Sequence, residues 1–560
     1  MSASKSGKRK HKIALPHFDN ENVSQICVLL GVCFTFLTRC VVVKRTGIQG
    51  SGYFFAAYEF LVFLLLFFPG GISAAVREQF GKRFESGFYR NAKRIFNAAV
   101  IAVFFYVLVI ALLWWQLSEV TSEYLLLGKT NTLPFMWLLP VFIVDALTLL
   151  LRGFLDGETE ASGDTVILNA FFPTSLVFMI RQASTFVFVL IFAGVFQGDG
   201  INASRLFRNE EVKYVYGAAG VAIGFLIGAV IGLVAMAAIY CKHLNFLQRQ
   251  VERDQNRRRE NSNGILFSQA ATAALACTGL FSMFFVAQIF AMYHFRTEAE
   301  LVRSYQWGIL LGICRTMSIL PLLSVFLMYL GDARQITLSM LRGDAHEVRI
   351  KCQSLTEFSM LIAFFFSSFT FAAAKVICKG CFGIDSVLAV RMLRCESVTV
   401  LFLVYALATS LQLLFMQKKN KVVTHSLGAM LIGAVLLWFL VPSERLGIYA
   451  VFVATIVCAT VLSFLNLLVL NRKIRFRSDP KSQFVWPFLS GAVSGAAALL
   501  LSILFGYFMP AFLSVVIIFF LSLLIFFIVG CKTGAITEYT FYGIPLGQYM
   551  ERFGRMLRLL

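Results

Sequence analysis

Residues 53–76 read YFFAAYEFLVFLLLFFPGGISAAV, a run that is long and apolar enough to cross a bilayer as a single helix. About 20 apolar residues span the hydrocarbon core, because in lipid a helix satisfies its own backbone hydrogen bonds. Similar runs recur along the whole chain, with short polar connectors between them. The chain is 58% hydrophobic and only 14% charged, which excludes an ordinary soluble domain. The sequence therefore predicts an all-α integral membrane protein.

Fourteen spans follow from these runs, and they fall into two sets of six and a final pair. They are predicted at 25–44, 53–76, 95–115, 133–151, 166–193, 214–241, 265–293, 304–330, 353–378, 396–416, 424–441, 446–470, 484–508 and 510–530. The predicted organisation is a basic cytoplasmic tail at 1–24, an N-lobe at 25–241, a basic linker at 242–264, a C-lobe at 265–470, a helix pair at 484–530 and an amphipathic cytoplasmic tail at 531–560.

Lysine and arginine predict the orientation, because they favour the cytoplasmic side of a membrane. With the N-terminus inside, the predicted cytoplasmic segments hold 34 basic residues and the opposite connectors hold 12. Both termini are therefore expected in the cytoplasm, and no cleavage site follows the basic start, so the first span is expected to be retained. The net charge of +20 is spread over these connectors, with its densest run at Arg257–Arg259. Anionic membrane lipids are the expected partner of this charge, and nucleic acid is not.

Two connectors resemble each other and indicate an internal repeat. The first runs from Arg77 to Gly87 after the second span, and the other runs from Arg334 to Gly343 after the eighth span. Each ends in a glycine a few residues before a basic amphipathic start of the next helix. Two parallel six-helix lobes with a substrate site between them are a known transporter plan. Chance similarity of two short basic loops is the alternative.

Four stretches carry a resemblance to a known family. They are GIQGSGYFFAAYEFLVFLLLFFPGGISAAVREQFGKRFESGFYRNAKRIF at 47–96, LRGFLDGETEASGDTVILNAFFPTSLVFMIRQ at 151–182, LPLLSVFLMYLGDARQITLSMLRGDAHEVR at 320–349 and ITEYTFYGIPLGQYMERFGRMLRLL at 536–560. In this order they resemble the polysaccharide-biosynthesis flippases. These belong, with stage V sporulation protein B and the MurJ-like lipid II flippases, to the multidrug/oligosaccharidyl-lipid/polysaccharide (MOP) exporter superfamily.

The resemblance implies a MATE/MurJ-like fold and a bacterial plasma-membrane flippase. It implies a polyprenyl-diphosphate-linked glycan or peptidoglycan precursor, moved from the inner to the outer leaflet by alternating access. The terminal helix pair is expected to hold the lipid tail, and the enzymes of cell-wall or glycan synthesis are the expected protein partners. The lipid II branch places cavity arginines on spans 1, 2 and 8, where this chain has Arg39, Arg77 and Arg315.

Arginines inside the spans are the candidate substrate-binding residues. A charge within the hydrocarbon is costly, so it faces a cavity or a partner by default. Guanidinium suits a diphosphate because it is permanently charged and donates in a fork. Arg181 and Arg315 lie well inside their spans, and we expect both to line the central cavity. Arg39 and Arg77 lie near span ends, where snorkelling to the headgroups is an equal alternative.

Acidic residues offer candidates for coupling or ion pairing. Glu59 is expected to pair with a cavity arginine or to carry a proton, and Asp145 is expected to pair with Arg152 two turns away. The sodium site of some relatives uses acidic side chains on spans 7, 11 and 12, and these spans have no Asp or Glu here. A metal site is therefore not expected. Cys378, Cys381 and Cys395 lie on the predicted outer face without a histidine partner, so a disulfide or free thiols are expected in place of zinc.

No enzyme signature accompanies these features. The chain has no Walker loop, no HExxH motif and no nucleophile elbow, so neither an enzyme nor a cofactor is expected. The alternative function is a MATE-type multidrug exporter of organic cations. Such an exporter is expected to line its cavity with carboxylates and aromatics, whereas the four arginines favour an anionic substrate.

Overall fold

The computed structural model describes residues 20–161, 172–254, 260–281, 283–443, 445–476, 479–536 and 547–556. These residues form helices and turns, and no strand occurs among them. The described part of the chain holds 12 helical segments long and apolar enough to cross a membrane. One of them, Ile26–Glu85, contains both the first and the second predicted span. The all-helical membrane architecture is thus confirmed, and the count of fourteen spans remains a prediction.

The helices before the long basic linker are called the first-half helices. Helix α1 (Asn20–Leu65) is interrupted at Gly47, where φ is 77°. The remaining elements are the π-helix η1 (Leu66–Gly70), α2 (Gly71–Glu85), α3 (Tyr89–Leu125), η2 (Lys129–Asn131), α4 (Thr132–Ala161), α6 (Phe172–Phe207) and α7 (Glu211–Arg253).

The helices after the linker are the second-half helices, and a terminal helix pair follows them. The second half comprises α8 (Ser262–Phe281), α9 (Met283–His294), η3 (Phe295–Thr297), α10 (Glu300–Trp307), η4 (Gly308–Cys314), α11 (Arg315–Leu341), α12 (Ala345–Cys381), α13 (Val387–Phe415), α14 (Lys419–Leu440), η5 (Gly447–Tyr449) and α15 (Ala450–Ile474). The terminal pair is α16 (Trp486–Phe508), preceded by η6 (Lys481–Val485), and α17 (Ala511–Thr533), with a short α18 (Gly547–Met556) after it.

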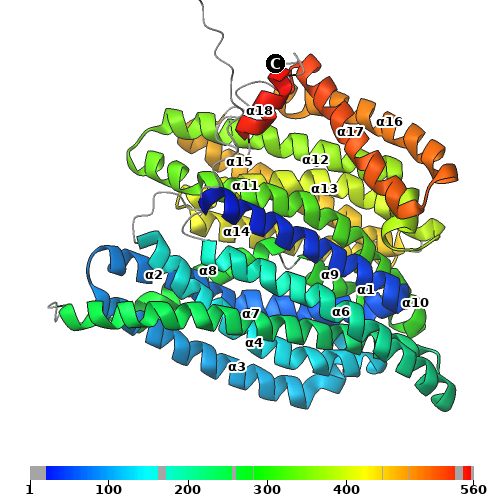
Figure 1. Ribbon diagram of the computed structural model, residues 1–560, viewed down its shortest axis with the longest axis horizontal. Coiled ribbons are helices and arrows are strands. Elements are labelled where there is room, and N and C mark those ends of the chain that lie inside the picture. The colour runs from blue at the N-terminus through cyan, green and yellow to red at the C-terminus, as the bar shows by residue number, and fades with distance from the viewer. Residues whose placement is uncertain are drawn as a thin grey trace, which may run out of the picture.

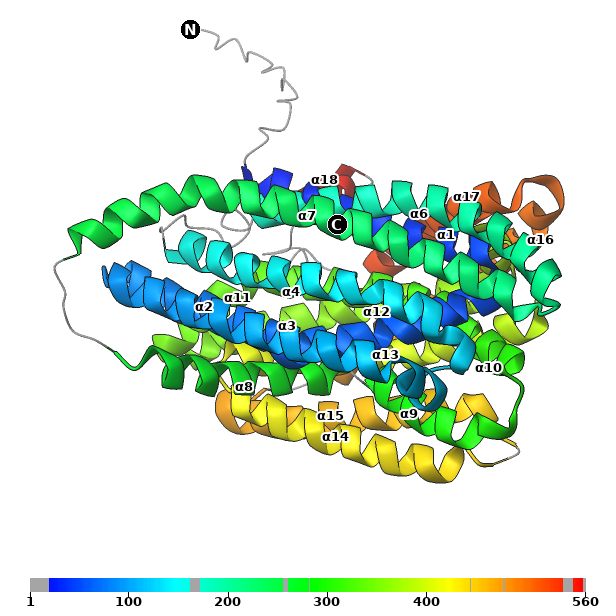
Figure 2. The same ribbon diagram turned by 90° about the horizontal axis from the view of Figure 1, so that it is seen from below.

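The helices lie side by side as one elongated bundle (Figures 1 and 2). Helices α3, α4 and α7 lie on one side of Figure 1, α12, α13 and α15 lie on the other, and α1 and α8 lie between them. Helix α1 contacts η4 and α10, and α2 contacts α8, so these elements join the two halves. The terminal pair packs against α12 at the edge of the second half.

The helices are longer than the apolar runs that predicted them. The third span was predicted at 95–115, and the helix that contains it, α3, extends by about one to three turns at either end. Helix α7 likewise continues to Arg253, so the first part of the predicted linker 242–264 is helical. Hydropathy marks the segment inside the hydrocarbon, whereas the backbone hydrogen bonds continue into the polar flanks. The run Arg257–Arg259 lies outside the described residues, as does most of the predicted tail 1–24.

The two similar connectors form turns with the same geometry. Gly87 and Gly343 have φ values of 78° and 79°, in the left-handed region that glycine adopts without a steric penalty. Each glycine N–H donates to the carbonyl three residues back, and the next N–H donates to the carbonyl five residues back. This pair of hydrogen bonds is the Schellman motif that ends many helices. The similarity of the two sequences thus corresponds to a shared way of ending α2 and α11.

Candidate functional site

Arg39 of α1 ties the first half of the molecule to the second half. Its side chain is buried, and its Nε donates to Thr316 Oγ1 at 2.9 Å. One terminal nitrogen donates to the Leu311 carbonyl oxygen at 2.7 Å, and the guanidinium carbon lies 4.0 Å from the centre of the Phe55 ring. Thr316 belongs to α11 and Leu311 to η4. Arg39 therefore faces the junction between the halves, and its position is not that of a snorkelling side chain.

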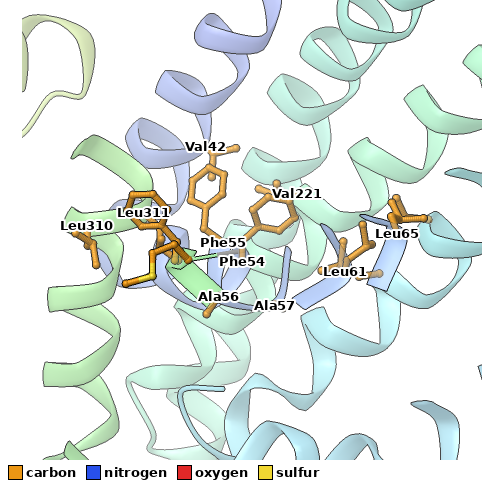
Figure 3. Packing of buried hydrophobic residues seen from close by; sticks show 14 of the residues in the cluster. Val42, Phe54, Phe55, Ala56, Ala57, Leu61, Leu65, Val221, Leu310 and Leu311 are labelled. Atoms are coloured by element: carbon orange, nitrogen blue, oxygen red, sulfur yellow. The ribbon is translucent and has the colours of Figure 1, made fainter. Parts of the chain in front are cut away.

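Buried apolar side chains from both halves pack together at this junction. Figure 3 shows Leu310 and Leu311 of η4 beside Phe54, Phe55 and Val42 of α1. All five side chains are at most 1% exposed. Closely packed apolar groups exclude water, and this strengthens the electrostatic interactions of the buried charges nearby.

Arg315 begins α11, directly after the π-helix η4. Its guanidinium carbon lies 3.7 Å from the centre of the Phe284 ring on α9. The side chain borders a cavity of about 80 Å³ within the second half, together with Met283, Phe284 and Thr455. No carboxylate of the described residues forms an ion pair with Arg315. The guanidinium group thus lies against an aromatic ring, and its N–H groups remain available to donate hydrogen bonds to another partner.

Tyr58 and Glu59 of α1 lie among three of the four predicted arginines. The Glu59 carboxylate is within electrostatic range of both Arg39 and Arg315. Tyr58 is within range of Arg39 and also of Arg181 on α6. The structure therefore brings Arg39, Arg181 and Arg315 around one segment of α1. We call these three arginines, with Tyr58 and Glu59, the arginine cluster.

Arg181 forms an ion pair that the sequence analysis assigned wrongly. Its terminal nitrogen lies 2.8 Å from a carboxylate oxygen of Asp145 on α4, and the Asp145 side chain is only 5% exposed. Arg152, the expected partner of Asp145, pairs with Asp156 one turn further along α4, at 3.3 Å. The packing of α6 against the first-half helices brings Arg181 to Asp145, and no pattern within α4 could reveal this.

Arg77 lies apart from the arginine cluster. It stands on α2, about 27 Å along the helix from Glu59. Its backbone packs against Gly157 of α4, and its charge is within electrostatic range of Asp156. The structure therefore places Arg77 in the contact between α2 and α4.

Glu396 of α13 is a buried acidic residue that the sequence analysis missed. It is 1% exposed, and it accepts a hydrogen bond from the Ser318 hydroxyl of α11. Its second carboxylate oxygen has no hydrogen-bond partner among the described residues. Glu396 is also within electrostatic range of Arg315. The predicted span started at this residue, and α13 begins nine residues earlier, so a carboxylate that looked terminal lies inside the helix.

Contacts between the two halves close the bundle on both sides of the arginine cluster. Toward the predicted outer face, Thr130 of η2 donates to Glu300 of α10 at 2.5 Å, and the Gln288 amide of α9 donates to the Leu125 carbonyl at 3.1 Å. Toward the predicted cytoplasmic face, Glu78 of α2 forms an ion pair with Lys419 at the start of α14. The structure is therefore a closed arrangement of the two halves.

On the predicted outer side, the two halves approach closely at Gly308, the first residue of η4. A Cβ placed on this residue would lie 1.9 Å from the Ile48 carbonyl oxygen of α1, which is far inside a van der Waals contact. We expect Gly308→Ala to force α1 and η4 apart and to disfavour the closed outer side. Oxidative cross-linking of a Thr130→Cys/Glu300→Cys pair measures this, and the variant should lose most of the cross-link.

Gly428→Ala is the matched control for that experiment. Gly428 lies in α14, and a Cβ there meets nothing within 4 Å, so cross-linking should not change. Undiminished cross-linking in Gly308→Ala would show that the close approach of α1 and η4 does not hold the outer side closed.

The described ranges bring together no group of three His, Cys, Asp or Glu side chains that could hold a metal ion. Cys378 and Cys381 are buried free thiols at the end of α12, and Cys395 is a partly buried free thiol on α13.

Comparison with solved structures identifies the fold that this architecture resembles. No family model and no curated protein matches the sequence. An inward-facing multidrug resistance MATE family transporter of the MOP superfamily matches with a TM-score of 0.59 at 12% identity, over 82% of this chain and 98% of that protein. The inward closed conformation of the lipid II flippase MurJ matches with a TM-score of 0.55 at 14% identity, over 90% of this chain and 97% of MurJ. The chain has the fold of the MOP superfamily transporters.

A third similar structure belongs to a MOP superfamily transporter from Pyrococcus furiosus. It matches with a TM-score of 0.53 at 13% identity, over 81% of this chain and 95% of that protein. Identities this low show the fold alone. The fold does not identify a substrate, so the evidence for one must come from the residues of this chain.

Proposed function

We propose that this protein belongs to the MOP superfamily and flips an anionic, polyprenyl-diphosphate-linked glycan or peptidoglycan precursor from the inner to the outer leaflet. In this proposal the protein lies in a bacterial plasma membrane with both termini in the cytoplasm. Two six-helix lobes move the substrate by alternating access. The observation that carries it is the arginine cluster, in which three arginines lie within electrostatic range of Tyr58 or Glu59 and Arg39 bonds across the junction of the two halves.

The charges of the arginine cluster favour a phosphate ligand. Asp145 compensates Arg181, whereas Arg39 and Arg315 share the more distant Glu59. Both guanidinium groups are permanently charged, and neither forms an ion pair with a described carboxylate, so both remain available to an anionic ligand. A diphosphate offers several strong acceptor oxygens to planar guanidinium donors, and such charge-assisted hydrogen bonds are about twice as strong as neutral ones.

The contacts of Arg39 suggest how binding is linked to opening. In the closed arrangement its donors are used by Thr316 and by the Leu311 carbonyl, both across the junction. Separation of α1 from η4 breaks these bonds and leaves a guanidinium that needs new acceptors. A diphosphate in the opened junction supplies them, so the ligand stabilises the open state by its differential affinity.

Glu396 is the specific observation that favours the second candidate, an exporter of organic cations. A buried carboxylate with an unpartnered oxygen attracts a cation or a proton. Glu396 nevertheless lies within the second half, beside Ser318 and within range of Arg315, which offsets its charge toward the junction. The flippase is therefore the stronger candidate.

A binding experiment separates the two candidates. Purified protein in nanodiscs should bind a fluorescent polyprenyl-diphosphate sugar and should show no saturable binding of an organic cation such as ethidium. Glu396→Gln should not abolish lipid binding, because the guanidinium groups of Arg39 and Arg315 remain in place. Saturable ethidium binding that disappears in Glu396→Gln, with no binding of the diphosphate, would instead establish the exporter.

A further inference from the structure

A lipid-facing groove lies where the two halves meet on the α3 side, away from the arginine cluster. It is an open cavity of about 510 Å³. Its wall is formed by Phe68 of η1, by Ala98, Ile101, Ala102, Phe105, Tyr106 and Val109 of α3, and by Asn263 and Phe267 of α8. Small-molecule sites measure about 300–1,000 Å³, so the volume is that of a binding site.

The groove is built differently from an ordinary lipid-facing surface. Phe68 stacks on Tyr106 with ring centroids 4.5 Å apart, and the Tyr106 hydroxyl donates to the Leu64 carbonyl at 3.0 Å. Leu64 lies two residues before the π-helix η1, where the helical hydrogen-bond pattern changes, and π-helical segments often occur at functional sites. The floor is therefore fixed by a hydrogen bond, while Phe105 and Phe267 remain 59% and 45% exposed at the rim.

The length of the groove corresponds to a single leaflet. Ala98, Ala102, Phe105 and Val109 recur every three or four residues, so they form one stripe along α3. The stripe from Ala98 to Val109 is about 16 Å long, close to half of the roughly 30 Å hydrocarbon core. One acyl chain of a phospholipid, extended along the stripe, matches this length.

A positive charge stands at the headgroup end of the stripe. Arg94 lies one turn before Ala98 on the same face of α3, and its side chain is exposed. One of its terminal nitrogens lies 3.2 Å from the Asn91 side-chain oxygen, and its other donors remain available to solvent or a headgroup. Basic side chains at the membrane surface attract anionic lipids. The charge at one end and the apolar stripe below it complement an anionic phospholipid.

We propose that this groove binds an anionic phospholipid, with one acyl chain along the α3 stripe and the phosphate at Arg94. The lipid contacts α3 and η1 of the first half and α8 of the second half, so it bridges the two moving parts. Its occupancy therefore stabilises the width that the groove has in the closed arrangement. This site is separate from the arginine cluster and does not depend on the identity of the transported substrate.

Photolabelling tests the proposal on the full chain. The protein is placed in nanodiscs with either a phosphatidylglycerol or a phosphatidylcholine that carries a diazirine on its acyl chain, and labelled peptides are identified by mass spectrometry. Phosphatidylglycerol should label 98–109 and 263–267 in preference to the exposed face of α16 around Leu500 and Leu504. Arg94→Gln should lower this preference about fivefold, to the level of phosphatidylcholine.

A second variant separates the groove from its headgroup contact. Ala102→Trp fills the groove, so labelling of 98–109 should fall with both lipids, while labelling of α16 stays the same. Equal labelling of the groove and α16, unchanged in Arg94→Gln, would show an ordinary lipid surface and overturn the proposal. Displacement of phosphatidylglycerol from the groove by equimolar polyprenyl diphosphate would also overturn it, because the groove would then belong to the substrate tail.

Discussion

Replacing Arg315 by alanine is expected to abolish transport while the protein remains in the membrane at near-normal abundance. The guanidinium lies against Phe284 with no ion-pair partner among the described residues, so its loss breaks no salt bridge, and Glu396 keeps its hydrogen bond from Ser318. If it holds a diphosphate, truncation should weaken binding by about 2 kcal/mol or more, or about 30-fold. Complementation of a flippase-deficient bacterial strain, with abundance followed by immunoblotting, measures both quantities.

Two further variants define what Arg315 contributes. Arg315→Lys should restore activity only in part, because an ammonium group does not offer the planar fork of donors. Arg342→Ala is the matched control, since Arg342 is an exposed arginine directly after the same helix. Wild-type complementation by Arg315→Ala would remove Arg315 from the substrate site.

Replacing Arg181 by alanine is expected to destabilise the protein strongly. The change leaves the Asp145 carboxylate buried without its cation, and breaking one side of a buried pair costs about 3–5 kcal/mol. The double variant Arg181→Ala/Asp145→Ala should recover much of this loss, since neither charge remains. Thermal unfolding of the purified protein in detergent measures the difference.

Lys129→Ala is the control for the Arg181 experiment. Lys129 pairs with Glu123 at 3.6 Å, and the two side chains are 73% and 39% exposed. Exposed pairs contribute about 0–1 kcal/mol, so its melting temperature should hardly change. Equal melting temperatures for Arg181→Ala and the wild type would show that the Arg181–Asp145 pair does not stabilise the first half.

The sequence predicted the architecture well because hydrophobic length is a local property. Apolar runs of about 20 residues identified the membrane helices, and the two similar loops, which indicated an internal repeat, form turns of the same geometry at Gly87 and Gly343. Hydropathy shows which part of a helix is apolar, but it does not show where the helix ends. The helical start of the predicted linker was therefore missed. The break of α1 at Gly47 and the π-helices η1 and η4 also carry no signal in hydropathy.

The sequence predicted only part of the candidate site, because it shows which residues are charged but not which helices pack together. Charges within apolar runs predicted Arg39, Arg181 and Arg315 as site residues, and each of them lies within electrostatic range of Tyr58 or Glu59. The partner of Asp145 was assigned wrongly because the ion pair joins α4 to α6, and such contacts depend on packing. Glu396 was missed because the predicted span 396–416 began at it, so its carboxylate looked terminal.

Flipping in proteoliposomes tests the central claim most directly. Liposomes with the purified protein receive a fluorescent polyprenyl-diphosphate sugar, and a membrane-impermeant quencher reports how much reaches the opposite leaflet. We predict flipping by the wild type, loss of flipping in Arg315→Ala, and no ethidium transport above that of empty liposomes. Ethidium transport that requires Glu396, without any flipping of the diphosphate lipid, would contradict the account.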